Sequence, residues 1–359
     1  DFRDPATRHH SCQDEVRLNR RLTDGVYLEV APIVRTPSGV CVGGDGEPVE
    51  WATVMRRLPA AGMLDAMLRA GAAPAALGQR LATALIPFHR DRCSPCGAGP
   101  ETAAAATRIV TENLAELAPF TPTFRGPGQF ALVASAMGGF IAENSALLER
   151  RAAEGWIREG HGDLRCEHIC LDEHGAVQVF DCVEFSQDLR CADVASDLAF
   201  LLMDLTRHGA DSAAADLQAA YRAAGLDLPD ALLRLYWAHR ALVRAKVACL
   251  KLTTTHEERT ALAVKAADYL DLATAACLTV RPALVVMTGL SGTGKSTVAR
   301  RVARALGAPL FASDVVRKQL AGVAGAAPAA WREGIYRPAL TAATYDHLFA
   351  QAGAELAAG

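Results

Sequence analysis

Lysine is scarce in this chain. Only five lysines occur among 359 residues, at positions 246, 251, 265, 295 and 318, so the first 245 residues contain none. Arginine supplies nearly all of the remaining positive charge, and 37 basic side chains stand against 40 acidic ones, for a net charge of −3. This balance gives no electrostatic case for a nucleic-acid-binding protein, so we expect no nucleic-acid partner.

Long apolar runs are also lacking. The longest candidate, residues 198–205, is interrupted by Asp204, and no run approaches the roughly 18 residues that a bilayer span needs. We therefore expect no membrane partner. The first residues carry neither a signal-peptide core nor an initiator Met. With 51% apolar and 21% charged residues the composition is that of a globular protein, and we predict a cytoplasmic chain of two or three domains that is a fragment of a longer protein.

Ten cysteines are present, but their spacing is not that of a secreted disulfide framework. The one CxxC motif is Cys93-Ser-Pro-Cys96, and Cys166 and Cys170 flank His168 with Cys182 and Cys191 following. A structural zinc site needs four convergent ligands, and no second CxxC or paired His occurs. Zinc is the less favoured alternative, and we expect reduced, partly buried thiols.

Short strands are predicted at the N-terminal end, and helices dominate afterwards. The expected strands cover residues 26–33, 40–42 and 51–58, and a further β pair covers 169–171 and 177–180. Helical periodicity marks residues 77–88, 109–117, about 130–158 and roughly 85 residues after Cys191. At Arg281-Pro282 the pattern changes, and 283–288 has the composition of a buried parallel strand. We place a domain boundary there, which gives domains 1–280 and 281–359.

Residues 289–296, Gly-Leu-Ser-Gly-Thr-Gly-Lys-Ser, match the phosphate-loop pattern G-x-x-x-x-G-K-[S/T]. Glycines let backbone N–H groups curl around phosphate oxygens, and the helix that follows adds its positive dipole. Lys295 would reach the β- and γ-phosphates of a nucleotide and the Ser296 hydroxyl would ligate Mg²⁺; the alternative is a chance match in a glycine-rich turn. The predicted nucleotide-binding residues are Gly289, Ser291, Gly292, Thr293, Gly294, Lys295, Ser296 and Thr297.

A second short strand is predicted at 310–312, followed by a helix that Ser313 and Asp314 would cap. Asp314 and Arg317 would then lie at the carboxyl end of a strand, where open α/β sheets bind ligands. Capping and surface solvation are the alternative roles of these two residues. The region resembles the small-molecule kinases of the P-loop superfamily, including relatives of zeta toxin, and this resemblance implies that Asp314 and Arg317 face the phosphate acceptor. No later apolar strand ending in Asp follows, so we expect an incomplete α/β P-loop domain.

A second set of polar residues runs through His161-Gly-Asp163-Leu-Arg165-Cys-Glu-His168 and ends at Asp181. Asp163 follows a helix on a polar loop, and Asp181 closes an apolar strand. Two carboxylates on neighbouring hairpin edges can converge on a metal-bound phosphate, one as base and one as Mg²⁺ ligand. The alternative is that the two are ordinary polar residues, because Asp is common in loops and at strand ends.

The spacing resembles the catalytic loop of aminoglycoside phosphotransferases and their protein-kinase-like relatives. In that family a metal-binding Asn follows the loop Asp by five residues and a metal-binding Asp follows it by eighteen; here these positions hold His168 and Asp181. Arg165 falls where protein kinases often carry a Lys near the transferred phosphate. The resemblance implies an α+β protein-kinase-like fold, ATP and Mg²⁺ as cofactors, and a small-molecule phosphate acceptor.

Two departures from the family pattern bear on activity. His168 replaces the Asn, and imidazole is a less typical Mg²⁺ ligand than an amide oxygen. No strand Lys to hold the α- and β-phosphates precedes Lys246. Members of the family carry it upstream of the part that matches Asp1, so we expect truncation rather than loss of this Lys. Arg56 or Arg57 would replace its charge but not its geometry. We predict an ATP-binding phosphotransferase with catalytic residues Asp163, Arg165 and Lys295; the alternative is a nucleotide-responsive module with a pseudokinase N-terminal domain.

Overall fold

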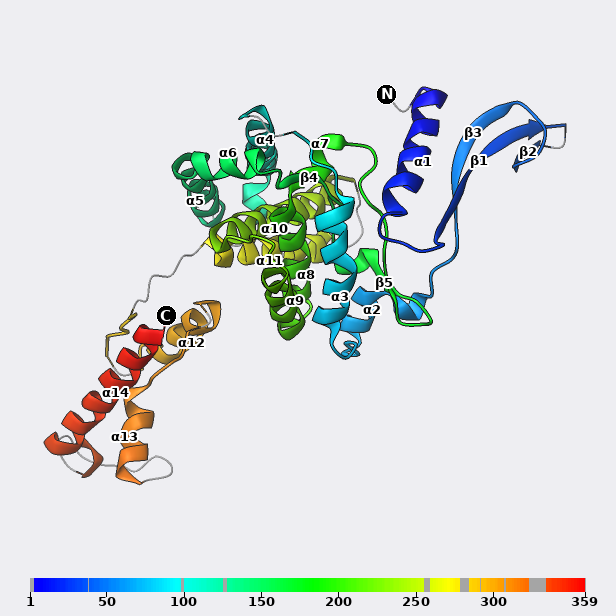
Figure 1. Ribbon diagram of the computed structural model, residues 1–359. Coiled ribbons are helices and arrows are strands. Elements are labelled where there is room, and N and C mark those ends of the chain that lie inside the picture. The colour runs from blue at the N-terminus through cyan, green and yellow to red at the C-terminus, as the bar shows by residue number, and fades with distance from the viewer. Residues whose placement is uncertain are drawn as a thin grey trace. The chain divides into compact units, whose positions relative to one another are not determined.

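The computed structural model of this chain describes residues 3–37, 39–97, 100–124, 128–254, 259–277, 284–290, 292–306, 308–322 and 334–358. Two compact units separate at residue 277: the first is Asp1–Cys277 and the second Leu278–Gly359. Within the described residues of each unit, helices are more numerous than strands, and Figure 1 shows their order along the chain.

A three-stranded antiparallel sheet with one helix opens the first unit. Its strands are β1 (Tyr27–Thr36), β2 (Gly39–Val42) and β3 (Pro48–Met55), in the order β2-β1-β3. Helix α1 (Pro5–Asn19) packs against β1 and β3, and the Asp4 carboxylate caps it by accepting from the Ala6 and Thr7 N–H groups. The three strands predicted from sequence are confirmed, with β1 running three residues further than expected.

The rest of the first unit is mainly helical, with two short β pairs. The pairs are β4 (Ile157–Glu159) with β7 (Cys191–Asp193) and β5 (Ile169–Leu171) with β6 (Val177–Val179), both antiparallel. The helices are α2 (Leu64–Arg69), α3 (Leu77–Pro87), α4 (Pro100–Leu117), α5 (Gln129–Glu143), α6 (Ser145–Ala153), α7 (Gln187–Arg190), α8 (Val194–Arg207), α9 (Asp211–Ala223), α10 (Asp230–Thr254) and α11 (Arg259–Cys277).

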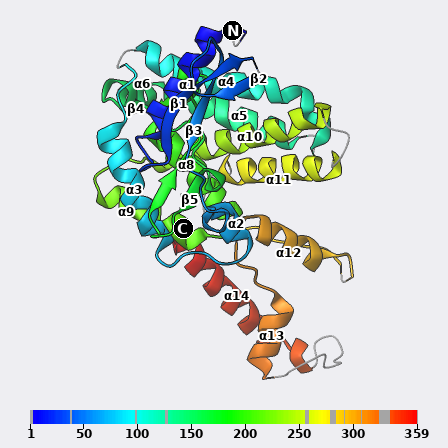
Figure 2. The ribbon, with the colours of Figure 1, turned by 90° about the vertical axis from the view of Figure 1, so that its right-hand side faces the viewer.

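Helix α8 forms the centre of the core. Every residue from Val194 to Leu205 is buried, as expected of a helix that is apolar on nearly all sides. Helices α9 and α10 pack against it, and α10 and α11 lie side by side (Figures 1 and 2). Because α8 is enclosed, polar groups at its N-terminus have fixed positions, and the candidate site is built on them.

A buried ion pair fixes the start of α8. The fully buried Arg151 donates from Nε and Nη2 to the two Asp193 carboxylate oxygens, at 2.8 and 2.7 Å. Its third nitrogen donates to the carbonyl and the carboxylate of Asp227, at 3.0 and 3.1 Å. The guanidinium also lies over the Trp156 ring, 4.4 Å from its centroid. Asp193 in turn caps α8 by accepting from the Ala195 N–H, so this pair joins α6, β7 and α8.

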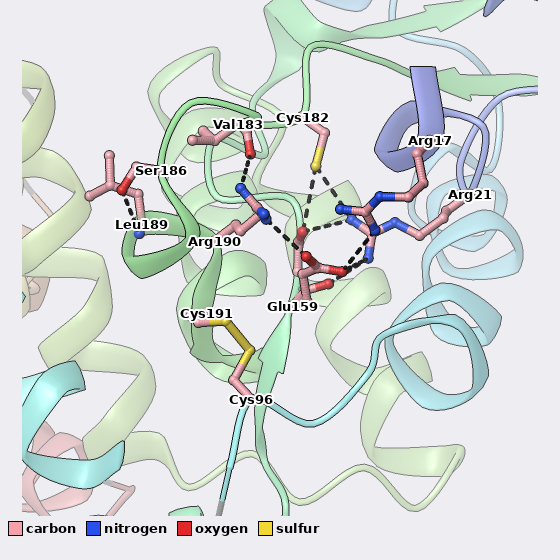
Figure 3. The surroundings of a disulfide bond; sticks show 11 residues. Arg17, Arg21, Cys96, Glu159, Cys182, Val183, Ser186, Leu189, Arg190 and Cys191 are labelled. Atoms are coloured by element: carbon pink, nitrogen blue, oxygen red, sulfur yellow. Dashed lines mark hydrogen bonds and ion pairs between the residues drawn. A yellow bond between two sulfur atoms is a disulfide. The ribbon is translucent and has the colours of Figure 1, made fainter. Parts of the chain in front are cut away.

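A disulfide between Cys96 and Cys191 corrects the expectation that the thiols are reduced (Figure 3). The segment before Cys96 adds to the β4–β7 pair, since the Glu159 N–H donates to the Ser94 carbonyl and the Cys96 N–H to the Ile157 carbonyl. This pairing brings Cys96 beside the first residue of β7. Eight other cysteines are free, among them Cys93 of the same CxxC motif. No cluster of three or more His, Cys, Asp or Glu able to hold a metal occurs among the described residues, so zinc gains no support.

Reduction of this disulfide is expected to lower the free energy of unfolding by about 2–4 kcal/mol, because the bond closes a long loop in the unfolded chain. Its two cysteines are separated by 95 residues. Urea unfolding with and without dithiothreitol measures the difference, and Cys96→Ser/Cys191→Ser is the control that dithiothreitol should leave unchanged. Titration of ten thiols, rather than eight, in the unfolded non-reduced protein would contradict the assignment.

Two sequence expectations fail in this unit and the next. The helix predicted over about 130–158 is divided into α5 and α6 at Asn144, and it ends before β4 because Gly155 takes a positive φ of 76°. In the second unit the strands predicted at 283–288 and 310–312 do not form within the described residues 284–290 and 308–322. Leu284, Val285 and Val286 are 53, 57 and 68% exposed. A parallel strand needs hydrogen-bonding neighbours, and two isolated segments cannot supply them.

Helices make up the regular structure of the described part of the second unit, so its predicted α/β character is not seen. They are α12 (Lys295–Leu306), α13 (Ser313–Ala321) and α14 (Pro338–Ala358). Taken singly, none of the described helices in the chain has the length and apolarity to cross a membrane; the bent pair α5–α6 meets the criterion only when its two helices are taken together.

Candidate active site

Residues 160–168, here called the HGD loop, lie between β4 and β5 and carry the candidate catalytic Asp163. Arg165 donates from Nε and Nη2 to the two carboxylate oxygens of Asp163, at 2.8 and 2.7 Å, and from Nη1 to Glu167. Burial on its own would raise the pKa of Asp163, but the hydrogen bonds and charge of Arg165 outweigh it and hold that pKa below the usual value. Asp163 is therefore an ionised carboxylate at neutral pH, and a weak base suited to orienting a hydroxyl.

His168 connects the HGD loop to the β5–β6 hairpin. Its Nδ1 lies 2.9 Å from the Asp163 carbonyl oxygen, and its Nε2 lies 3.1 Å from the Asp181 Oδ2 and 3.1 Å from a nitrogen of Arg165. A carbonyl oxygen can only accept, so we infer that Nδ1 carries the proton. In that tautomer Nε2 is the acceptor, and it lies between the Arg165 guanidinium and the Asp181 carboxylate.

Asp181 follows β6 in the left-handed backbone region, with φ at 64°. Its side chain is 62% exposed, and its N–H donates to the Tyr27 hydroxyl at 3.3 Å. Non-glycine residues rarely adopt this conformation, although Asp and Asn tolerate it best. The turn aims the carboxylate back toward His168, so the structure brings together Asp163, Arg165, His168 and Asp181, four residues that the sequence singled out.

Asp197 fixes the position of the HGD loop, a role that the sequence pattern did not reveal. Its carboxylate accepts from the His161 N–H at 2.5 Å and from the Gly162 N–H at 2.9 Å, and it lies 3.5 Å from His89 Nε2. Burial would raise the pKa of Asp197, but His89 and Arg240 lower it further than burial raises it. A Cβ on Gly160 would lie 2.3 Å from Asp197 Oδ2, so that position requires glycine.

His161 is a buried structural part of the loop. Its Nε2 lies 2.9 Å from the Phe180 carbonyl oxygen and its Nδ1 accepts from the Asp163 N–H at 3.3 Å. Burial lowers the pKa of His161 to about 4. The neutral ring therefore links the loop to the strand that precedes Asp181, which sets the distance between the two candidate carboxylates.

Acidification is expected to destabilise the first unit below about pH 6.5. Burial lowers the pKa of His161 to about 4 and that of His239, on α10, to about 3, from an ordinary value of 6.5. Between these values the unfolded chain binds protons that the folded chain does not. The contribution of the two histidines is therefore constant above pH 6.5 and falls as the pH drops toward 4, by roughly 3 kcal/mol for His161 alone. Urea unfolding at a series of pH values measures the slope. His239→Gln should reduce the number of protons taken up on unfolding, which sets this slope, by about one. An unchanged slope would refute this account.

The predicted phosphate loop forms a turn at the start of α12. Gly289, Gly292 and Gly294 take positive φ values of 141, 82 and 83°, which only glycine adopts readily. Thr297 and Val298 donate to the Gly294 carbonyl, which starts the helix. No backbone hydrogen bond joins the N–H of Lys295 or Ser296 to another residue in the described part of the chain. These amides are the ones that would bind an anion.

Lys295 folds back over this turn, and its Nζ donates to the Leu290 carbonyl, which also accepts from the Thr293 hydroxyl at 2.8 Å. Ser296 and Thr297 are exposed on the first turn of α12. Ser291 lies outside the described residues. Asp314 pairs with Lys318 at 2.7 Å, and the Arg317 guanidinium lies 4.9 Å from the Tyr336 ring centroid. The two expected acceptor residues thus have structural partners within their own unit.

Arg56, one of the two arginines considered as a replacement for the missing strand lysine, is bound elsewhere. Its Nε and Nη2 donate to the Gly25 carbonyl, at 2.9 and 2.5 Å. This contact closes the connection between α1 and β1 against the end of β3. Arg56 as placed therefore stabilises the sheet; Arg57 is exposed.

Comparisons with known proteins match both units. A family model described as "Phosphotransferase enzyme family" matches residues 2–235, and one described as "AAA domain" matches residues 284–359. An uncharacterized protein of Mycobacterium bovis and two from strains of Mycobacterium tuberculosis are each 34% identical over 366 residues, a match that covers all of this chain and 70% of the relative. No solved structure gives a significant match.

Proposed function

Because the chain belongs to the phosphotransferase enzyme family, with an AAA domain following its phosphotransferase domain, we propose that its first unit transfers the γ-phosphoryl group of ATP to a hydroxyl of a small molecule. The convergence of Asp163, His168 and Asp181 carries this proposal: the Asp163 carbonyl and Asp181 Oδ2 lie 2.9 and 3.1 Å from opposite nitrogens of one imidazole. One loop and one hairpin thus hold both carboxylates.

Asp163 would orient the acceptor hydroxyl. The acceptor oxygen forms a bond to the γ-phosphorus as the bond to the β,γ-bridging oxygen breaks, ADP leaves, and the hydroxyl proton passes to the Asp163 carboxylate and then to water. Arg165, which keeps Asp163 ionised, would supply positive charge near the transferred group. Removing this positioned carboxylate should affect the rate of transfer far more than the binding of ATP.

His168 and Asp181 fit a Mg²⁺ ion only together with nucleotide phosphates. Their facing Nε2 and Oδ2 atoms would be two ligands once Nε2 is released from the Arg165 nitrogen that lies 3.1 Å from it, and Mg²⁺ commonly takes one or two protein ligands with phosphates and waters completing its shell. The ion would neutralise charge on the β- and γ-phosphates.

In the second unit Lys295 and Ser296 would bind a nucleotide independently of the first unit. The other residues of the loop, which would give it its shape, are Gly289, Gly292, Thr293, Gly294 and Thr297. Asp314 and Arg317 would lie near the phosphate acceptor of this second site.

The second candidate function is a nucleotide-responsive module whose first unit is a pseudokinase. Two observations favour it: His168 stands where the family carries a metal-binding Asn, and Arg165 occupies both oxygens of Asp163. ATP turnover by Asp163→Asn and by Lys295→Ala, each in the full chain, separates the two functions. The proposed transferase loses acceptor-dependent ADP release with Asp163→Asn. If turnover survives that change and vanishes with Lys295→Ala, the first unit is not the working enzyme.

A further inference from the structure

A cavity of about 670 Å³ lies beside the HGD loop, wholly within the first unit. Its wall combines the loop residues Arg165 and Glu167 with α2, the C-terminal end of α8, α10 and α11. The volume suits a small metabolite. Arg165 lines the cavity and also holds Asp163, so the cavity and the candidate base share one side chain.

The acidic side chains of this wall all have partners. Asp268 is one of them, since it takes part in a polar or electrostatic interaction. The other pairs are Asp65 with Arg69 at 2.7 Å, Glu167 with Arg165, Asp204 with the Cys166 N–H at 3.0 Å, and Asp271 with Gln129 at 2.7 Å. These contacts hold the carboxylates in place, and the five acidic side chains of the wall are balanced by five basic ones, Arg69, Arg165, Arg207, Arg244 and Lys265.

Two cations of the wall keep unused donors. The Nε of Arg244 is buried and makes no hydrogen bond to any described residue, and the nearest carboxylate oxygen paired with this guanidinium, on Glu167, lies 3.8 Å away. Lys265, on the facing helix α11, has no hydrogen bond or ion pair within the described ranges. Burial and the positive charges of Arg244 and Arg207 lower the pKa of Lys265. Cations that repel one another in a partly buried space are stabilised by a bound anion.

We infer that this cavity receives the phosphate acceptor, and that the acceptor is a small hydroxyl compound bearing an anionic group, phosphate or carboxylate, which Arg244 and Lys265 bind. The inference rests on the proposed phosphotransferase function. The anionic group would occupy the α10–α11 side of the cavity, and the hydroxyl would extend past Arg165 toward Asp163. A polycationic acceptor would meet the positive charges of Arg244 and Lys265 on that side of the cavity and be repelled.

Calorimetric titration of the full chain tests the anion subsite first. The probes are inorganic phosphate and acetate at matched ionic strength, and all variants carry Lys295→Ala so that the phosphate loop does not contribute. Phosphate, acetate or both should bind with a Kd on the order of millimolar, and Lys265→Gln should weaken that binding about tenfold because a charge-assisted hydrogen bond is lost. Lys265→Arg should restore it. Lys246→Gln, also on this helical pair but outside the cavity wall, is the matched control.

Binding of neither anion, or binding that Lys265→Gln leaves unchanged, overturns the inference. A second measurement separates this failure from that of the proposed function: ADP release with hydroxy acids and sugar phosphates as acceptors, against the corresponding neutral sugars. If neutral sugars are phosphorylated and Lys265→Gln leaves the rate of ADP release unchanged, the transferase function is supported and the anionic acceptor is refuted. Lys265-dependent anion binding without acceptor-dependent ADP release refutes the transferase and leaves the anion site standing.

Discussion

Asp163→Asn is expected to lower acceptor-dependent ADP release about 10³-fold while the KM for ATP stays nearly constant. The amide keeps the shape of the side chain and can still accept from Arg165, but it cannot take the hydroxyl proton and offers one acceptor oxygen in place of two. The loss should therefore appear in kcat, since the hydroxyl is aligned and deprotonated only as transfer proceeds.

The matched control for this change is Asp188→Asn, on α7. That carboxylate is 70% exposed and makes one long contact with Arg108, at 3.4 Å, so its loss should leave both kcat and stability unchanged. Thermal unfolding of Asp163→Asn shows whether the fold is retained. Activity within tenfold of the parent chain, in a variant that folds normally, would remove Asp163 from the mechanism.

Arg151→Ala is expected to lower the free energy of unfolding by about 3–5 kcal/mol, because it leaves the Asp193 carboxylate buried without its cation. Asp193 is 1% exposed, and both of its oxygens accept from Arg151. Loss of the guanidinium also removes the contact with the Trp156 ring and the hydrogen bonds to Asp227. Equilibrium unfolding in urea measures the change.

Arg150→Ala, at the neighbouring position of α6, separates this burial effect from helix propensity. Arg150 is 61% exposed and its contact with Glu154 is 3.8 Å long, so its removal should cost no more than about 0.5 kcal/mol. Since Asp193 caps the helix that carries Asp197, Arg151→Ala should also reduce activity in protein that remains folded. Equal destabilisation by the two substitutions would argue against the buried pair.

The elements that the sequence predicts correctly are those with local signals. The strands expected at 26–33, 40–42 and 51–58 correspond to the N-terminal sheet, and the β pair expected at 169–171 and 177–180 corresponds to β5 and β6. The spacing of Asp163, His168 and Asp181 brings these residues into one cluster because a short hairpin separates them. Such features depend on a few neighbouring residues, so the local sequence is enough to predict them.

Features that depend on distant partners were missed. Residues 157–159 form a strand because β7, more than thirty residues later in sequence, pairs with them, and the Cys96–Cys191 bond depends on the same pairing. The role of Asp197 follows from contact with two backbone amides that only the folded loop presents. Conversely, the apolar run at 284–288 carries the local signal of a strand but lacks neighbours within the described residues.

At Asp181 the left-handed backbone conformation makes the residue that is best for stability different from the residue that is best for activity. Glycine would adopt that backbone geometry with less strain, by about 1 kcal/mol, but it would bring no oxygen to His168. A laboratory selection for thermal stability alone is therefore expected to favour Asp181→Gly. The selected variants would unfold at a higher temperature but would lack the contact between the carboxylate and the imidazole.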